Sequence, residues 1–204
     1  DEGAIDIAAV GEALKLAEGF DAVLIGPGLG RAQETQKFVQ DFCTAVKKPL
    51  ILDADAIHAF CGKAEAFKSF AFVPVLTPHL GEMAHLLGFS VDELRTSLLD
   101  MVREAAHEYH AVFVVKSECT IIVYPDGQVF LTSKGNSGMA TAGAGDVLAG
   151  AIAGLMKQTA AGLAPLAGVY IHGLAGDLAA KEKGYGLIAS DILENLPCAL
   201  CTLV

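Results

Sequence analysis

The chain of 204 residues has no tryptophan, few other aromatic residues and few basic side chains. Its 14 lysines and arginines stand against 24 aspartates and glutamates, so the formal net charge is −10. This balance argues against a nucleic-acid-binding surface, because binding to a phosphate backbone needs clustered lysine and arginine. The apolar stretches are interrupted well before the roughly 18 residues of a membrane-spanning helix, so we expect no membrane span.

The cysteines do not indicate a disulfide framework. There are five, an odd number with irregular spacing, and no basic segment precedes an apolar run as in a signal peptide. We therefore expect reduced thiols and a cytoplasmic protein. Cys198 and Cys201 form a C-x-x-C pair, which is weak evidence for a metal or redox site without further ligands nearby.

The proportions of apolar and charged residues are those of a folded domain. Hydrophobic residues make up 53% of the chain and charged residues 19%, which excludes intrinsic disorder. A chain of this length has enough residues for a full hydrophobic core. We therefore expect a single domain over residues 1–204.

Strand and helix patterns alternate through the first half of the chain. Short apolar runs without alternation, which are typical of strands buried on both faces, occupy residues 22–25, 50–52, 73–76 and 111–115. Between these runs, the spacing of apolar residues predicts helices near 32–46, 81–88 and 91–109. This alternation predicts an α/β fold with a mostly parallel central sheet and helices on both of its faces.

After residue 116 the pattern changes. Residues 120–124 and 128–132 are predicted strands, and the turn Pro125-Asp126-Gly127 between them indicates a β-hairpin in the C-terminal half. Two long helices are predicted near 145–158 and 164–182.

Polar residues gather at the predicted strand ends. The segment Gly26-Pro27-Gly28 and the residues Asp53, Asp55, His79 and Lys116 each follow an apolar run. In open α/β sheets, ligands bind in the crevice outside the carboxyl ends of the strands. The sequence therefore predicts a binding site at this edge of the sheet.

A glycine-rich turn precedes the first of the two long helices. The segment Gly143-Ala144-Gly145 has no side chain large enough to cover the first N–H groups of a helix that is apolar all round. Bare amides at the positive end of a helix dipole bind phosphate, so an acidic chain can hold an anion here, with Lys116 and Lys134 adding local charge. Within the helix, we expect Gly150 and Gly154 to allow close approach of a neighbouring element.

Asp146 follows this turn directly, and two compatible interpretations are open. A carboxylate in the first turn of a helix commonly caps it. A carboxylate beside an anion site can also accept the proton of a hydroxyl that attacks a phosphate.

Five motifs resemble those of the ADP/ATP-dependent NAD(P)H-hydrate dehydratases of the ribokinase-like superfamily, and they span residues 23–177 in the family's order. The motifs are Val23-Leu24-Ile25-Gly26-Pro27-Gly28-Leu29-Gly30, Leu52-Asp53-Ala54-Asp55-Ala56, Thr77-Pro78-His79-Leu80-Gly81-Glu82-Met83, Asn136-Ser137-Gly138-Met139-Ala140-Thr141 with Gly143-Ala144-Gly145-Asp146, and Val169-Tyr170-Ile171-His172-Gly173-Leu174-Ala175-Gly176-Asp177. The resemblance implies a ribokinase-like three-layer sandwich.

The resemblance also implies a reaction. The family removes the water that has added to the nicotinamide ring of NADH or NADPH, at the expense of ADP in bacteria and ATP in eukaryotes, with Mg²⁺ on the nucleotide. Asp146 would be the catalytic base, and Gly143, Ala144 and Gly145 would form the anion hole for the phosphoryl group. No side chain is assigned as a dedicated metal ligand, and a homo-oligomer is expected.

The remaining site residues follow by the same resemblance. The expected nucleotide-binding residues are Lys116, Thr120, Asn136, Ser137, Gly138, Met139, Ala140, Thr141 and Gly145. The expected substrate-binding residues are Gly28, Asp53, His79 and Asp146. Other interpretations are open for several of them: His79 as a loop histidine, Lys116 as a solvated strand end and Asp53 as a helix cap. We expect His172 and Asp177 to pack against the neighbours of their helix rather than to take part in catalysis.

The sequence departs from the family pattern at three points. Leu80 and His58 stand where proline and asparagine are common, and we expect the chain to lack strands and helices that precede the first motif in the family. This leaves part of the substrate pocket unassigned. Two other functions therefore stay open, namely a sugar or vitamin kinase of the same fold and a non-catalytic nucleotide-binding subunit.

Overall fold

The computed structural model describes residues 4–159 and 162–202. They divide into two compact units, the first made of Asp1–Ser117 with Ile121–Val129 and the second of Glu118–Thr120 with Phe130–Val204. Each unit has its own hydrophobic core. The single domain expected from the length stays a prediction.

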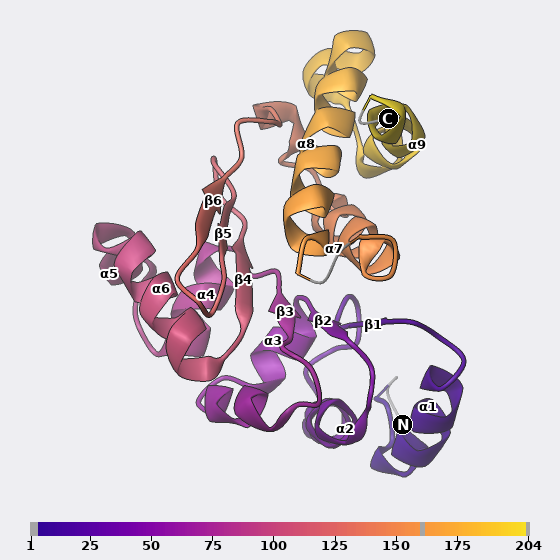
Figure 1. The fold of residues 1–204 in the computed structure, drawn as a ribbon, viewed down its shortest axis with the longest axis vertical. Helices are drawn as coiled ribbons and strands as arrows, with labels where there is room; N and C mark the ends of the chain where they lie inside the picture. Colours follow the sequence, from indigo (N-terminus) through magenta and orange to yellow (C-terminus); the bar gives the residue numbers. More distant parts are fainter. Residues whose placement is uncertain (1–3, 160–161, 203–204) are drawn as a thin grey trace. The chain divides into compact units, whose positions relative to one another are not determined.

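A six-stranded sheet runs in chain order from β1 to β6 (Figure 1). Strands β1 to β4 pair in parallel, and β5 pairs with β4 in the antiparallel direction. The strands are β1 (Val23–Ile25), β2 (Leu50–Leu52), β3 (Val75–Leu76), β4 (Val112–Val115), β5 (Ile121–Val123) and β6 (Val129–Leu131). The mostly parallel sheet and the hairpin after residue 116 are therefore confirmed, because short β-branched and apolar runs fit strands that are buried on both faces.

Helices connect the parallel strands of the first unit. They are η1 (Ile7–Ala9), α1 (Val10–Ala17), α2 (Gln33–Ala45), α3 (Asp55–Ala59), η2 (Ala64–Ser69), α4 (Leu80–Leu87), α5 (Val91–Thr96) and α6 (Leu98–Tyr109). The single helix expected over 91–109 is wrong in one respect, because Ser97 leaves the helical region at φ −142° and ψ 36° and separates α5 from α6. Helix α1 was not expected, since it is too short to give a clear apolar period, whereas α3 is the helix expected to follow Asp53.

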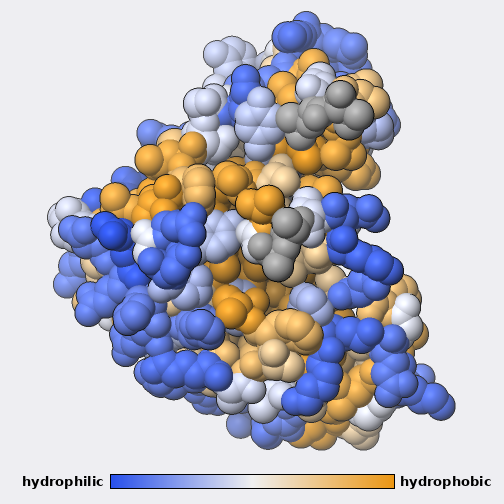
Figure 2. Space-filling view, in the orientation of Figure 1, coloured by the Kyte–Doolittle hydropathy of each residue, from blue (hydrophilic) through white to orange (hydrophobic). Residues whose placement is uncertain are grey.

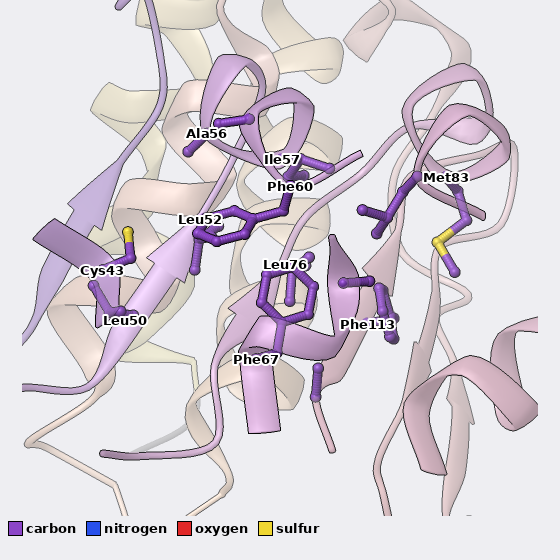
Figure 3. Packing of buried hydrophobic residues seen from close by; sticks show 14 of the residues in the cluster. Cys43, Leu50, Leu52, Ala56, Ile57, Phe60, Phe67, Leu76, Met83 and Phe113 are labelled. Atoms are coloured by element: carbon purple, nitrogen blue, oxygen red, sulfur yellow. The ribbon is translucent and has the colours of Figure 1, made fainter. Parts of the chain in front are cut away.

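The core of the first unit lies where α3 and η2 meet the sheet. Phe60 and Phe67 are fully buried, and their ring centroids are 5.0 Å apart. Figure 3 shows these rings beside Leu52 of β2 and Leu76 of β3. Burying aromatic rings against strand residues fixes α3 close to the end of β2, and this places the polar residues that flank the helix.

The second unit consists mainly of three helices and two short 3₁₀ turns. They are η3 (Ser137–Met139), α7 (Ala144–Leu155), α8 (Ala164–Lys183), η4 (Gly184–Gly186) and α9 (Ala189–Cys201). The two long helices predicted from the sequence are confirmed within three residues at each end. The close approach of α7 and α8 occurs at Gly168 of α8, where a Cβ atom would lie 2.6 Å from Ile152 Cγ1.

The roles expected for Gly150 and Gly154 are wrong. Both are exposed, and a Cβ atom on either would meet no other atom within 4 Å in the part of the chain that the structure describes. The reason is that α7 packs through another side, where Leu148, Ala149 and Ile152 are buried.

Apolar side chains remain exposed in both units, and Figure 2 shows apolar surface on one face of the molecule. Leu16 and Phe20 are exposed in the first unit, and Tyr185 and Leu193 in the second. The homo-oligomer expected from the sequence stays a prediction. Among residues 4–159 and 162–202, no helix combines the length and the apolar character needed to cross a bilayer.

Gly26 is expected to tolerate no side chain, because its backbone touches the β2–α3 turn. It has φ +131°, and a Cβ atom would lie 1.7 Å from the Asp53 carbonyl oxygen. We expect Gly26→Ala to lower the free energy of unfolding by about 3 kcal/mol or more. The matched control is Gly62→Ala, at φ +71° in open space, with an expected loss of about 1 kcal/mol. Denaturant unfolding measures both, and equal losses would contradict the close approach.

Candidate functional site

A buried ion pair joins the carboxyl ends of β2 and β4, which lie on either side of β3 in the parallel part of the sheet. Asp53 follows β2, Thr77 follows β3 and Lys116 follows β4. Lys116 Nζ lies 2.8 Å from Asp53 Oδ1, and the Thr77 hydroxyl donates a 2.7 Å hydrogen bond to the same oxygen. The Asp53 side chain is 2% exposed and that of Lys116 is 23% exposed. The prediction that polar residues gather at this edge is therefore confirmed for these side chains.

This arrangement decides between the interpretations of Asp53 and Lys116. Helix α3 has Ala54 as its N-cap, with no side-chain cap bond, so Asp53 does not cap it. Lys116 is committed to Asp53 and is not a solvated strand end. The lysine charge is available to a ligand only in part, because a buried carboxylate already neutralises it.

The glycine turn after β1 is tied to α3 by Asp55. Its carboxylate accepts a 2.9 Å hydrogen bond from the Gly30 N–H and lies 2.9 Å from Arg31 Nε. Gly28 has φ +70°, and no other atom lies within 4 Å of its Cβ position in the described residues. The backbone at Gly28 is therefore open to a ligand, which is compatible with the expected substrate contact without testing it.

His79 is the N-cap of α4. Its Nδ1 accepts a 3.1 Å hydrogen bond from the Glu82 N–H, and the Glu82 carboxylate accepts a 2.9 Å bond from the His79 N–H. This reciprocal pair satisfies two amide groups that the start of a helix leaves without partners. The His79 side chain is still 59% exposed, so its capping role leaves most of the ring accessible.

A pocket of about 270 Å³ opens beside His79, within the first unit. It is lined by Arg31, Ile57, His58, Cys61, His79, Gly81, Glu82 and His85. Burial lowers the pKa of His58, and the Arg31 guanidinium lowers it further. Burial raises the pKa of the Cys61 thiol to about 11. No local sequence pattern places His58, Cys61 and His85 together, because they come from α3, from the turn that follows it and from α4.

The glycine-rich turn of the second unit leaves amide groups free at the start of α7. Gly143 is the N-cap at φ 85°, and no side chain caps the helix. The Ala144 N–H donates a 3.3 Å hydrogen bond to the Thr141 carbonyl. The N–H groups of Gly143, Gly145 and Asp146 donate to no acceptor in residues 4–159 and 162–202. The anion hole stays a prediction, with Ala144 as its least available donor.

Asp146 is the third residue of α7, and its side chain is exposed. Across the described residues its carboxylate accepts no hydrogen bond, and the helix has no side-chain cap. The capping interpretation is therefore not supported by a hydrogen bond. The carboxylate stands within one residue of the free Gly145 amide and is available to an incoming hydroxyl.

Asn136 organises the segment that leads to this turn. Its Nδ2 lies 3.1 Å from both the Gly176 carbonyl and Asp177 Oδ1, and its Oδ1 accepts a 3.1 Å hydrogen bond from the Gly138 N–H. Asp177 Oδ2 accepts a further 3.2 Å hydrogen bond from the Gly135 N–H. One half-buried carboxylate of α8 therefore fixes the backbone at residues 135–138.

The role of Asp177 was missed by the sequence analysis, which expected it only to pack. The available signal was a lone acidic residue in the middle of a largely apolar helix. The packing expected for His172 is confirmed, because its ring Nε2 lies 3.0 Å from the Ala144 carbonyl at the start of α7; its absence from catalysis stays a prediction.

The expected nucleotide-binding residues from Ser137 to Thr141 lie on the same irregular stretch of the second unit, whereas Thr120 directly precedes β5. Ser137, Gly138 and Met139 form η3, and Met139 fills the space that Gly176 leaves, since a Cβ atom there would lie 2.2 Å from the Met139 sulfur. Ala140 is exposed, the Thr141 carbonyl accepts from Ala144, and the Thr120 carbonyl accepts from the Thr132 N–H. The predicted site residues thus form two groups, one in each unit.

Lys116→Met is expected to destabilise the first unit strongly, because it leaves the buried Asp53 carboxylate without its counter-charge. We expect a loss of about 3 kcal/mol or more in the free energy of unfolding. The double variant Asp53→Asn with Lys116→Met should lose less than the sum of the single variants. The control is Lys37→Met, which breaks the exposed ion pair with Asp41 and should change stability by less than about 0.5 kcal/mol. A loss for Lys116→Met as small as this control would contradict the proposed strength of the pair.

Asp177→Ala is expected to loosen residues 135–138, because two donors lose their acceptor. A hydrogen bond to a charged group contributes about 1.5 kcal/mol, so amide hydrogen exchange at Gly135 and Gly138 should accelerate by roughly tenfold. Glu182→Ala, an exposed position near the end of the same helix, is the matched control and should leave these rates unchanged. Equal exchange in both variants would show that the segment is held by other contacts.

Comparison with known proteins places the chain in a family. The family model described as NAD(P)H-hydrate dehydratase matches residues 5–198. The bifunctional NAD(P)H-hydrate repair enzyme Nnr of Thermofilum pendens is 45% identical over 195 residues, which cover 93% of this chain and 37% of that protein. The chain therefore spans little more than a third of the length of the curated relatives that it matches.

Solved structures agree with this match. The ADP/ATP-dependent NAD(P)H-hydrate dehydratase from Bacillus subtilis, co-crystallised with ATP/Mg²⁺ and soaked with CoA, superposes with a TM-score of 0.82 at 31% identity, over 90% of this chain and 67% of that one. A ribokinase-like superfamily protein from Enterococcus faecalis gives a TM-score of 0.80 at 30% identity, over 97% and 69%. The predicted ribokinase-like fold is thus confirmed. With a family model that matches nearly the whole chain, this protein belongs to the NAD(P)H-hydrate dehydratase family.

Proposed function

We propose that this chain removes the added water from hydrated NADH or NADPH at the expense of ADP or ATP. The observation that carries the proposal is the exposed Asp146 carboxylate, which accepts no hydrogen bond in the described residues and adjoins the free amides of Gly143 and Gly145. The names of the relatives support the same reaction, since they are repair enzymes for NAD(P)H hydrates and an ADP/ATP-dependent dehydratase.

The chemistry follows from the need for a better leaving group than hydroxide. Asp146 accepts the proton of the ring hydroxyl. At the same time the oxygen of that hydroxyl forms a bond to the terminal phosphorus of the nucleotide, and the bond from this phosphorus to the rest of the nucleotide breaks. The resulting phosphate then leaves with the C–O electron pair, and loss of a ring proton restores the reduced nicotinamide. The amides of Gly143 and Gly145 stabilise the negative charge on the transferring group.

Mg²⁺ would neutralise charge on the nucleotide phosphates. In the described residues, the one group of three metal-ligating side chains is His58, Cys61 and His85, which is not the oxygen set that Mg²⁺ prefers. Mg²⁺ is therefore expected to be held by phosphate oxygens and water rather than by a cage of carboxylates, as is usual for nucleotide-bound Mg²⁺.

The other site residues bind and position. We assign the segment from Asn136 to Thr141 to the nucleotide, with Asp177 as a positioning residue behind it. Gly28 and His79 are assigned to the hydrate, because the first has open space above its backbone and the second has an exposed ring. The cysteines of the described residues form no disulfide bond, which supports a cytoplasmic location.

Asp146→Asn is expected to abolish turnover without abolishing nucleotide binding. Loss of a general base lowers the rate by about 10² to 10⁴-fold, whereas removal of a negative charge near the phosphates should leave ADP affinity equal or higher. The assay supplies chemically hydrated NADH with ADP or ATP and Mg²⁺, and follows the return of reduced-nicotinamide absorbance; calorimetry gives ADP affinity. The matched control is Asp92→Asn, which changes a carboxylate in the first turn of α5.

Each outcome of this assay is informative. Turnover that survives Asp146→Asn would refute the assignment of the base. An unmodified chain that restores no absorbance but phosphorylates a sugar or vitamin alcohol would replace the dehydratase by the kinase. A chain that binds ADP with neither activity would be the non-catalytic nucleotide-binding subunit.

A further inference from the structure

Three metal-ligating side chains gather in the pocket of the first unit. His58 lies on α3, Cys61 lies two residues after the end of that helix, and His85 lies on α4. One ligand atom from each residue lies within 4.8 Å of the others. His58 and Cys61 lie three residues apart across the end of α3, and α4 presents His85 beside them.

The two imidazoles have no hydrogen-bond partner that explains their position. In residues 4–159 and 162–202, neither the His58 nor the His85 imidazole makes a hydrogen bond, and the two rings stack with centroids 5.0 Å apart and an interplanar angle of 8°. Cys61 makes only a weak contact, from Sγ to the Ile57 carbonyl at 3.8 Å. The lone pairs of these side chains are therefore available to a ligand.

We propose that His58, Cys61 and His85 form a Zn²⁺ site. Zn²⁺ binds imidazole nitrogen at about 2.0 Å and thiolate sulfur at about 2.3 Å, so tetrahedral ligand atoms lie about 3.4 to 3.6 Å apart. The ligand atoms lie within 4.8 Å of one another, so they must approach by about 1 Å to reach the tetrahedral spacing. His85 is exposed and its ring is not held by a hydrogen bond, so rotation of this side chain supplies the movement.

The donor set selects the metal. One sulfur and two imidazole nitrogens suit Zn²⁺ and similar borderline metals, and they do not suit Mg²⁺ or Ca²⁺. Binding replaces the thiol proton of Cys61, so the thiolate contributes one negative charge. Glu82 lines the same pocket, and the positive charge of Arg31 is partly compensated by its ion pair with Asp55.

The site has three protein ligands and lies against open space. Structural zinc sites are closed by four protein ligands, whereas sites that bind exchangeable groups leave one position to water or another ligand. The pocket of about 270 Å³ beside the cluster supplies room for such a fourth ligand. The C-x-x-C pair at the end of α9 is a weaker candidate, because in the described residues it has no third histidine, cysteine or carboxylate within ligand distance.

Co²⁺ is the probe for this site, because it adopts the geometry of Zn²⁺ and reports its ligands by absorption. The complete chain, titrated with Co²⁺ under reducing conditions, should develop visible bands of a tetrahedral centre and a sulfur-to-cobalt charge-transfer band at one equivalent, and Zn²⁺ should abolish both. Cys61→Ser should remove the charge-transfer band. His85→Gln, at an exposed position that should not affect folding, should weaken binding by more than about tenfold.

Two controls separate the cluster from other donors. Cys198→Ser combined with Cys201→Ser removes the C-x-x-C pair, and His107→Gln removes an exposed histidine of α6; both variants should keep the full spectrum. The proposal is overturned if the unmodified chain binds no Co²⁺, or if the charge-transfer band survives Cys61→Ser. The experiment needs no turnover, so its result is independent of the dehydratase proposal.

Discussion

One buried carboxylate organises the edge of the sheet where the first group of site residues lies. The Asp53 carboxylate pairs with Lys116 at the end of β4 and accepts a hydrogen bond from the Thr77 hydroxyl at the end of β3. Gly26, which follows β1, packs against the main-chain carbonyl of Asp53. A buried charge is tolerated only when it is paired and hydrogen-bonded. The ends of β2, β3 and β4 are therefore tied together by the need to compensate a single buried carboxylate, and the close approach of Gly26 to the main chain of Asp53 adds the end of β1.

The second unit handles charge in a different way. The chain carries a net charge of −10, yet the turn before α7 offers main-chain N–H groups that stay unpaired in the described residues. Amides of this kind attract anions without any basic surface. Asn136 and Asp177 fix the approach to this turn through four hydrogen bonds around residues 135–138. An acidic protein can in this way hold an acidic ligand.

Much of the fold could be predicted from the sequence, because its elements have strong local signals. The buried β-branched runs identify β1, β2 and β4, and the apolar helices α7 and α8 follow from composition alone. The failures have physical causes. Ser97 breaks a helix through its own backbone conformation, and the contact between α7 and α8 is made at Gly168 rather than at Gly150 or Gly154. The contacts of Asp177 and the cluster at Cys61 form only in the tertiary structure, so the sequence shows a lone acidic residue in an apolar helix but not the partners of these side chains.

The pairing of Lys116 with Asp53 also bears on how the first unit folds. The two residues are 63 positions apart, and Thr77 is 24 positions from Asp53. Contacts of such long range require large loops to close before they become favourable, and this slows folding. The carboxylate would be dehydrated without compensation if β2 became enclosed before β4 arrived. We therefore expect the strands to assemble cooperatively and late in folding. In partially folded states, the edge of the sheet around Asp53 should stay hydrated.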